Sequence, residues 1–178
     1  MSTISWRFTV WLLMNEASPL RLLRHARFPK QPNELRAELM HRNVHSDVLR
    51  FCKTELLQDN YFHCVLEAAK SAAQKIRDKS GIEADGASLV DEVFSIKSPR
   101  LALNTLQTES EQSEKKGFAN LLKGVFGTFR NVTAHAPKII WAVNRTDAMD
   151  ALTILSYIHR RLDEAVVVPL IGLPGNTG

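Results

Sequence analysis

Apolar residues recur every three or four positions through much of the chain, which is the spacing of one face of an α-helix. The clearest case is the segment DNYFHCVLEAAKSAAQKIRDKSG, residues 59–81. Its apolar positions share one face and are Tyr61, Val65, Ala68, Ala69, Ala72 and Ile76. Gly81 follows as a typical residue to end such a helix. The pattern predicts a long amphipathic helix that packs through this face.

Two later segments show equally strong apolar stripes. In FANLLKGVFGTFRNVTAH, residues 118–135, the stripe consists of Phe118, Leu121, Leu122, Val125, Phe126, Phe129 and Val132. In TDAMDALTILSYIHRRLDEA, residues 146–165, it consists of Met149, Leu152, Leu155, Ile158 and Leu162. Both segments are predicted to be helices of the core.

Shorter helices are predicted elsewhere. NELRAELMHR has Asn33 as an N-cap, HSDVLRFCKTELL has Ser46 as a cap, and DGASLVDEVFSI forms a short helix before the turn at Pro99. Residues 104–117 are polar without a hydrophobic period and are predicted to form a loop. The sequence therefore predicts an all-α fold, a bundle of four main helices with accessory short helices.

The composition shifts at both ends of this helical region. Residues 1–32 form a predicted N-terminal arm and linker, residues 33–165 the helical domain, and residues 166–178 an extended C-terminal tail with two prolines and three glycines. A length of 178 residues suits one such domain.

Charge and cysteine content narrow the class of protein. The net charge is +4, which fits a nucleic-acid partner without requiring one. Cys52 and Cys64 do not form a CxxC pair and are predicted to be reduced, buried thiols. The apolar run 4–14 is too short to span a bilayer, which needs about 20 apolar residues. A cytoplasmic protein without membrane contact is expected.

One polar group stands out within FRNVTAHAP, residues 129–137. Arg130, Asn131 and His135 lie together before Pro137, which disfavours helix at the preceding residue. A histidine in the last helical turn feels the negative end of the helix dipole and suits proton exchange. His135 fits the acid or base of RNA cleavage by 2′-hydroxyl attack, and Arg130 fits the cation on the phosphate. The alternative is an ordinary helix C-terminus whose polar side chains have no catalytic role.

On a straight α-helix, Arg130 and His135 lie roughly 140° apart, because each residue advances about 100°. A single helix does not aim both groups at one small target. Two copies facing each other across a two-fold axis would bring the arginine of one chain near the histidine of the other. A homodimer is therefore predicted.

The RNVTAH pattern at Arg130, Asn131 and His135 resembles the mark of the HEPN superfamily, an arginine, a polar residue and a histidine on a late helix of a bundle. More closely, the chain resembles the Ymh-type group of bacterial and phage proteins over about residues 45–165. The likeness is carried by DNYFHCVLEAAKSAAQKIRDKSG, DGASLVDEVFSI, LNTLQTESEQSEKKGFANLLKGVFGTFRN and DALTILSYIHRRLDEA.

The resemblance implies a HEPN-like four-helix bundle and a dimeric, metal-independent endoribonuclease that acts on RNA as a toxin or phage-defence effector. Arg130, Asn131 and His135 would be its catalytic residues, with no cofactor and no metal. The alternative is a non-catalytic helical module that dimerises or binds a partner protein of a defence system.

Other polar residues have plainer interpretations. His41 and His45 have metal-ligand spacing on a possible helix, but no third ligand is evident. Cys64 and His159 are predicted core residues, and His63 does not face Cys64. Glu67 is either a support of the site or a solvated residue. Glu109, Glu111 and Glu114 lie where a helix dipole favours acids and are assigned no catalytic role. The three lysines near them either guide RNA or are solvated surface: Lys115, Lys116 and Lys123. Motifs of P-loop, dinucleotide-binding, zincin and serine-hydrolase proteins do not occur.

Overall fold

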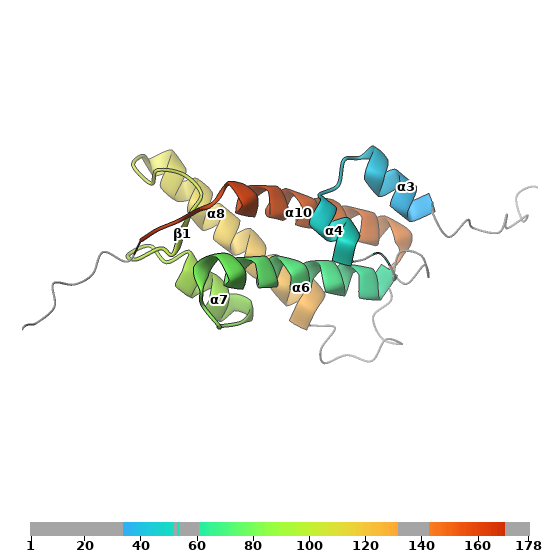
Figure 1. The fold of residues 1–178 in the computed structure, drawn as a ribbon, viewed down its shortest axis with the longest axis horizontal. Helices are drawn as coiled ribbons and strands as arrows, with labels where there is room; N and C mark the ends of the chain where they lie inside the picture. Colours follow the sequence, from blue (N-terminus) through green and yellow to red (C-terminus); the bar gives the residue numbers. More distant parts are fainter. Residues whose placement is uncertain (1–33, 52, 54–60, 132–142, 170–178) are drawn as a thin grey trace, which may run out of the picture. The chain divides into compact units, whose positions relative to one another are not determined.

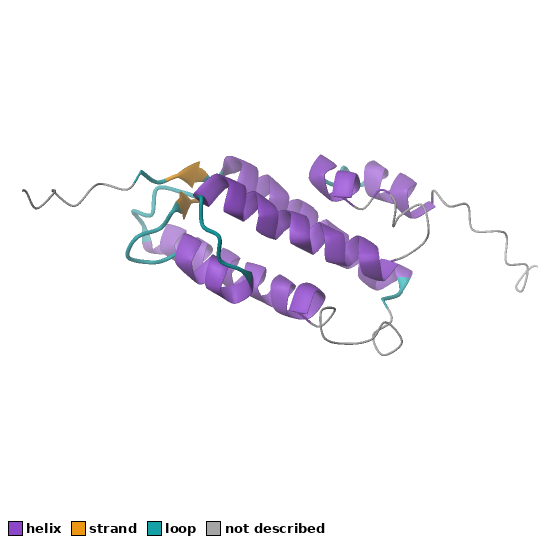
Figure 2. Ribbon diagram, turned by 60° about the horizontal axis from the view of Figure 1, so that its bottom comes forward, coloured by secondary structure: helices purple, strands orange, loops and turns teal. Residues whose placement is uncertain are grey.

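The computed structural model describes residues 34–51, 53, 61–131 and 143–169. These residues form an all-α fold with one small strand pair, which confirms the predicted fold class (Figures 1 and 2). The helices are α3 (Glu34–His41), α4 (Ser46–Phe51), α6 (Tyr61–Ser80), α7 (Gly86–Val93), α8 (Glu109–Val125), η1 (Phe126–Asn131) and α10 (Arg145–Glu164). The predicted arm at residues 1–32, with the cap Asn33, lies outside the described residues, as does Cys52.

Helices α6 and α10 are the two longest and pack against each other (Figure 1). The predicted apolar faces are confirmed: the stripe of α10 is buried throughout, and on α6 only Tyr61 is partly exposed. The face of α6 is rich in alanine, whose small side chain lets the leucines of α10 approach its backbone closely. The buried alanines are Ala68, Ala69, Ala72 and Ala73.

The second half of the bundle is built by α7, α8 and η1. Helix α7 contacts α6, α8 and η1, and η1 also contacts α6. Phe118, Leu122, Val125 and Phe126 are buried, while Leu121 and Phe129 are partly buried. This part of the predicted stripe is confirmed, and its first residue after η1, Val132, lies outside the described residues.

The predicted loop over residues 104–117 is wrong beyond Thr108, because α8 begins at Glu109. The side chain of Thr108 accepts a hydrogen bond from the backbone N–H of Glu111 at 3.2 Å, and the Glu111 carboxylate accepts from the N–H of Thr108 at 3.0 Å. This is a capping box, which satisfies two N–H groups that the helix itself leaves unpaired. The first turn faces solvent, so the segment shows no hydrophobic period.

Two other predicted helix ends can be compared with the structure. Gly81 ends α6 with φ +70°, and its N–H donates to the carbonyl of Arg77 at 2.8 Å. The predicted cap of α4 is wrong by one position, because Ser46 is already helical. His45 takes that role: its Nδ1 accepts from the N–H of Asp47 at 3.1 Å.

A short antiparallel strand pair joins the end of the domain to the segment after α7. Strand β1 (Leu101–Ala102) pairs with β2 (Val166–Val167), with Leu101 opposite Val167 and Ala102 opposite Val166 (Figure 2). The start of the predicted extended tail is therefore a strand. Among the described residues, no helix is both long and apolar enough to cross a membrane.

Candidate functional site

Arg130 lies on η1, a π-helical segment that continues directly from α8. Phe126 at its start is fully buried and Phe129 is half-buried, so the two rings fix this segment against the core. The side chain of Arg130 is 22% exposed and lies at the edge of the bundle. π-Helical turns are rare and occur frequently at functional sites.

The guanidinium of Arg130 donates to Asp85, the residue before α7. Arg77 of α6 donates to the other carboxylate oxygen of Asp85 at 3.3 Å. Asp85 occupies the N-cap position of α7, but its side chain makes no capping hydrogen bond. Two cations from α6 and η1 thus meet at one carboxylate that is 53% exposed, and we call this group the arginine pair.

The arginine pair affects the titration of its carboxylate. Desolvation raises the pKa of Asp85, but the hydrogen bond from Arg130, the backbone N–H of Gly86 and the charges of both arginines outweigh it. The net result is a pKa below the ordinary value for aspartate. Asp85 is therefore ionised at neutral pH, and the three groups together carry a charge of +1.

The structure places only part of the predicted catalytic set. Asn131 is the last residue of η1. His135 and Pro137 lie outside the described residues, so the meeting of Arg130 with His135 stays a prediction. The assumed straight α-helix, however, is wrong over residues 126–131, because the π-helical turn advances less than 100° per residue there. The estimate of 140° between the two side chains also depends on residues 132–135, which lie outside the described part of the chain, so the angle stays a prediction.

Several of the charged residues have structural partners. Lys115 is buried and donates to the carbonyl of Ser95 at 2.8 Å, so it cannot guide RNA. Lys123 pairs with Asp91, and Glu67 pairs with Lys70 at 2.6 Å.

The acidic residues near the start of α8 also have partners. Glu111 caps the helix, and Glu114 accepts from Arg161 at 2.5 Å and from Asn104 at 2.9 Å. Glu109 and Lys116 are exposed. For Glu111 and Glu114 the structural interpretation is sufficient.

The histidines divide into different environments. His41 ends α3 and His45 precedes α4, so the possible helix carrying both is not formed. His63 stands against Phe62, with ring centroids 5.3 Å apart, and Cys64 is buried as predicted. His159 is fully buried on α10, which confirms it as a core residue.

Sequence reasoning missed Asp85 and Arg77. They are eight positions apart, Arg77 on α6 and Asp85 just before α7, and the turn at Gly81 brings them together. An N-cap prediction at Asp85 would have assigned its carboxylate to α7 instead of to the arginines. The contact with Arg130, 45 positions away, has no local signal in the sequence.

Comparison with protein families gives a match over most of the helical domain. A family model described as "Protein of unknown function (Hypoth_ymh)" matches residues 42–162, about two thirds of the chain. The matched range includes α6, all of α10 except its last two residues, and the whole RNVTAH segment. Neither the curated proteins nor the solved structures yield a match.

Proposed function

The chain belongs to the Hypoth_ymh family, whose function is unknown, and we propose that it is a metal-independent endoribonuclease of the HEPN type. The observation that carries the proposal is the convergence of Arg130 and Arg77 on the exposed carboxylate of Asp85. The arginine of the predicted motif is thus a surface cation with a second cation beside it. This arrangement suits the charge of a phosphodiester.

In the proposed reaction, the 2′-hydroxyl of RNA attacks the adjacent phosphorus and the 5′-oxygen leaves. His135 exchanges the protons, acting as base or acid near neutral pH. Arg130 stabilises the charge that develops on the phosphorane oxygens, and Asn131 hydrogen-bonds a phosphate oxygen or the histidine. The products are a 2′,3′-cyclic phosphate and a 5′-hydroxyl, so the step needs no water and no metal.

Asp85 acts in this scheme as a positioning residue. Without RNA it holds the guanidinium of Arg130 in place, which limits the entropy that the long side chain would lose on binding phosphate. Because the Arg130 side chain is itself 22% exposed, a substrate phosphate can reach its guanidinium from solvent. The proposed setting is the cytoplasm, where the enzyme would act as a toxin or phage-defence effector.

Cleavage of total RNA in EDTA tests the proposal. We expect the wild type to cleave, and Arg130→Ala and His135→Ala to cleave at least 10²-fold more slowly, because each removes a group that acts in the transition state. Arg42→Ala is the matched control, since Arg42 also sits in an exposed ion pair, with Glu38 at 2.8 Å. Folded wild type that leaves all RNA intact would favour the non-catalytic helical module.

We further propose that two chains form the active cleft. Light scattering should give about twice 20.1 kDa at micromolar concentration. Mixing Arg130→Ala with His135→Ala chains should restore part of the activity, because one cleft of a mixed dimer would keep both groups. A strict monomer contradicts the shared cleft, and a dimer without restoration indicates a site within one chain.

A further inference from the structure

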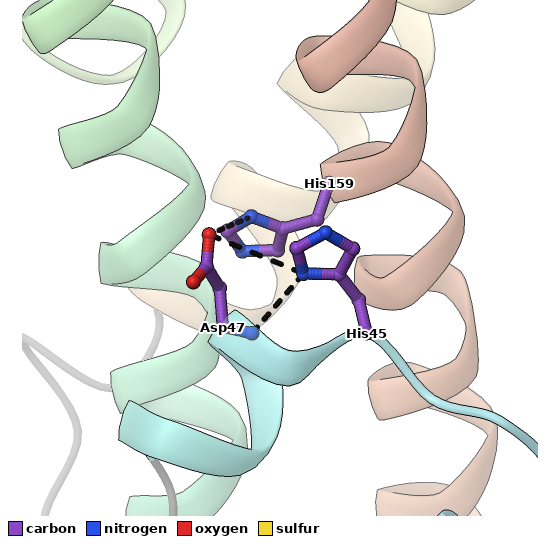
Figure 3. A group of neighbouring side chains, drawn as sticks. All are labelled: His45, Asp47 and His159. Atoms are coloured by element: carbon purple, nitrogen blue, oxygen red, sulfur yellow. Dashed lines mark hydrogen bonds and ion pairs between the residues drawn. The ribbon is translucent and has the colours of Figure 1, made fainter.

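A second polar cluster lies where α4, α6 and α10 pack against one another. We call it the histidine cluster, and it consists of His45, Asp47, Lys75, His159 and Asp163. Three of its members point toward one another in Figure 3: His45 just before α4, Asp47 on α4, and His159 on α10. One donor atom from each of these three lies within 4.8 Å of the other two.

The hydrogen bonds of Ser71 fix the tautomer of His159. The hydroxyl of Ser71 donates to the carbonyl of Ala68 at 2.7 Å, so its oxygen can only accept from His159 Nε2, which lies 3.0 Å away. Nε2 therefore carries the hydrogen, and Nδ1 of the neutral ring is a bare lone pair. This Nδ1 is completely buried and has no hydrogen-bond partner among the described residues.

The lone pair of His159 faces a carboxylate. Nδ1 lies 3.6 Å from Oδ2 of Asp47, and two acceptors at this distance repel each other unless a positive group lies between them. A buried nitrogen without a partner is costly, and it calls for an explanation such as an ion.

His45 also has its Nδ1 near the carboxylate of Asp47. Its Nε2 lies 2.7 Å from Oδ2 of Asp163, and its Nδ1 accepts the N–H of Asp47, so the hydrogen of the neutral ring is again on Nε2. Nδ1 lies 4.0 Å from Oδ2 of Asp47. Histidines that bind metals donate the remote N–H to a protein acceptor in this way, which fixes the ring and its lone pair. Here Ser71 and Asp163 are those acceptors.

We propose that the histidine cluster binds a divalent transition metal ion of the zinc type through Nδ1 of His45, Nδ1 of His159 and the carboxylate of Asp47. Two imidazoles and one carboxylate are a donor set that zinc accepts, with solvent in the fourth position. Donor atoms about 2.0–2.2 Å from a tetrahedral ion lie roughly 3.3–3.6 Å apart. The distances of 3.6 and 4.0 Å to Asp47 therefore need only a small contraction. Because Nδ1 of His45 has a single lone pair, it would exchange its hydrogen bond from the N–H of Asp47 for the bond to the ion.

Lys75 is compatible with this ion. Its ammonium lies 2.7 Å from Oδ2 of Asp47, but it also pairs with Asp163. The ammonium keeps a partner when Asp47 turns toward the metal. The two carboxylates and Lys75 carry a net charge of −1, which attracts a cation. The ion would tie α4 to α10 and thereby stabilise the fold.

Zinc binding to the untagged full-length chain, stripped with a chelator and dialysed, tests the site. Competition with a chromophoric chelator should give one zinc per chain. Asp47→Asn and His159→Gln should bind at least about tenfold more weakly, because each removes a metal ligand. Asp150→Asn and His41→Gln are the matched controls, since both residues are exposed, and they should bind as the wild type does.

Two further measurements keep the test decisive if His159→Gln does not fold. Cobalt(II) should give the intense visible absorption of a tetrahedral site in the wild type but not in Asp47→Asn. The ¹⁵N resonances of the His45 and His159 rings should shift on zinc binding most strongly at Nδ1. A wild type that takes up no zinc, or Asp47→Asn that binds it as tightly, would overturn the proposal. Since no RNA is involved, that result would leave the ribonuclease proposal standing.

Discussion

The histidine cluster and the arginine pair both use carboxylates beside α6, but they differ in burial. His159 is fully buried among α4, α6 and α10, and each polar contact around it fixes a neighbouring helix. Asp85 is 53% exposed, and the ion pairs that it forms with the two arginines lie at the surface. Buried polar groups are costly to leave unpaired, whereas exposed ion pairs stabilise little. Substitutions in the histidine cluster should therefore act on stability, and substitutions of Arg130 on activity.

The largest effect is expected for Arg130→Ala. Cleavage should slow by about 10³-fold, the range for loss of a cation that stabilises a transition state. The melting temperature should fall by less than about 4 °C, because an exposed ion pair contributes at most ~1 kcal/mol. Arg130→Lys keeps the charge but not the planar fork, and it should lie between the two rates. A large fall in the melting temperature of Arg130→Ala with little change in its cleavage rate would contradict the contrast drawn between the two clusters.

The next effect concerns acid stability of the metal-stripped protein. Desolvation, followed by the charges of Lys75 and His45, lowers the pKa of His159 to about 4, against 6.5 in the unfolded chain. Between these values the unfolded chain binds the proton and the folded one does not, so stability falls as the pH falls from about 6.5 to 4. The total loss should be about 3 kcal/mol.

Urea unfolding at several pH values measures this loss. His159→Gln removes the titrating ring and should flatten the profile between pH 4 and 6.5. A wild-type stability that is constant over this range would show that the ring is not held in its neutral form.

A smaller effect is expected for Ser71→Ala. It removes the acceptor of His159 Nε2 and leaves a buried N–H unpaired, which costs roughly 1–3 kcal/mol. Ser88→Ala on the exposed face of α7 is the matched control and should stay within about 0.5 kcal/mol of the wild type. Equal unfolding midpoints in urea for the two variants would contradict the tautomer assigned to His159.

The smallest effect is expected for Asp85→Asn. The side chain is half-exposed, so stability at neutral pH should change by less than about 1 kcal/mol. Because the pKa of Asp85 lies below its ordinary value, its contribution is present at neutral pH and is lost only as the pH falls through the folded pKa. RNA cleavage should change by a few-fold at most, mainly in KM. A loss as large as that of Arg130→Ala would make Asp85 a catalytic residue.

The sequence predicts local features of this fold better than contacts between distant segments. The apolar stripes of α6 and α10 can be predicted from sequence, because a helix with one buried and one exposed face must keep its apolar residues at helical spacing. The start of α8 was missed although T-E-S-E at residues 108–111 is a capping-box signal. The π-helical turn left no trace, because an apolar stripe over residues 118–129 fits both helix types.

Neither polar cluster could be assembled from sequence. Arg130 and Asp85 are 45 positions apart, and the contact of His159 with Asp47 depends on how α4 packs on α10. The pair His41 and His45 pointed to a metal through helical spacing, yet the turn between the helices separates them. His45 instead joins Asp47 and His159, ligands that become neighbours only in the fold.

The chemistry of the products tests the central claim most directly. A defined RNA cleaved in EDTA by the wild type should carry a 2′,3′-cyclic phosphate on one fragment and a 5′-hydroxyl on the other. A 2′-deoxy substitution at the scissile nucleotide should prevent the cut. Fragments with 5′-phosphate ends, or cleavage that persists without the 2′-hydroxyl, would contradict the attack that Arg130 and His135 are proposed to catalyse.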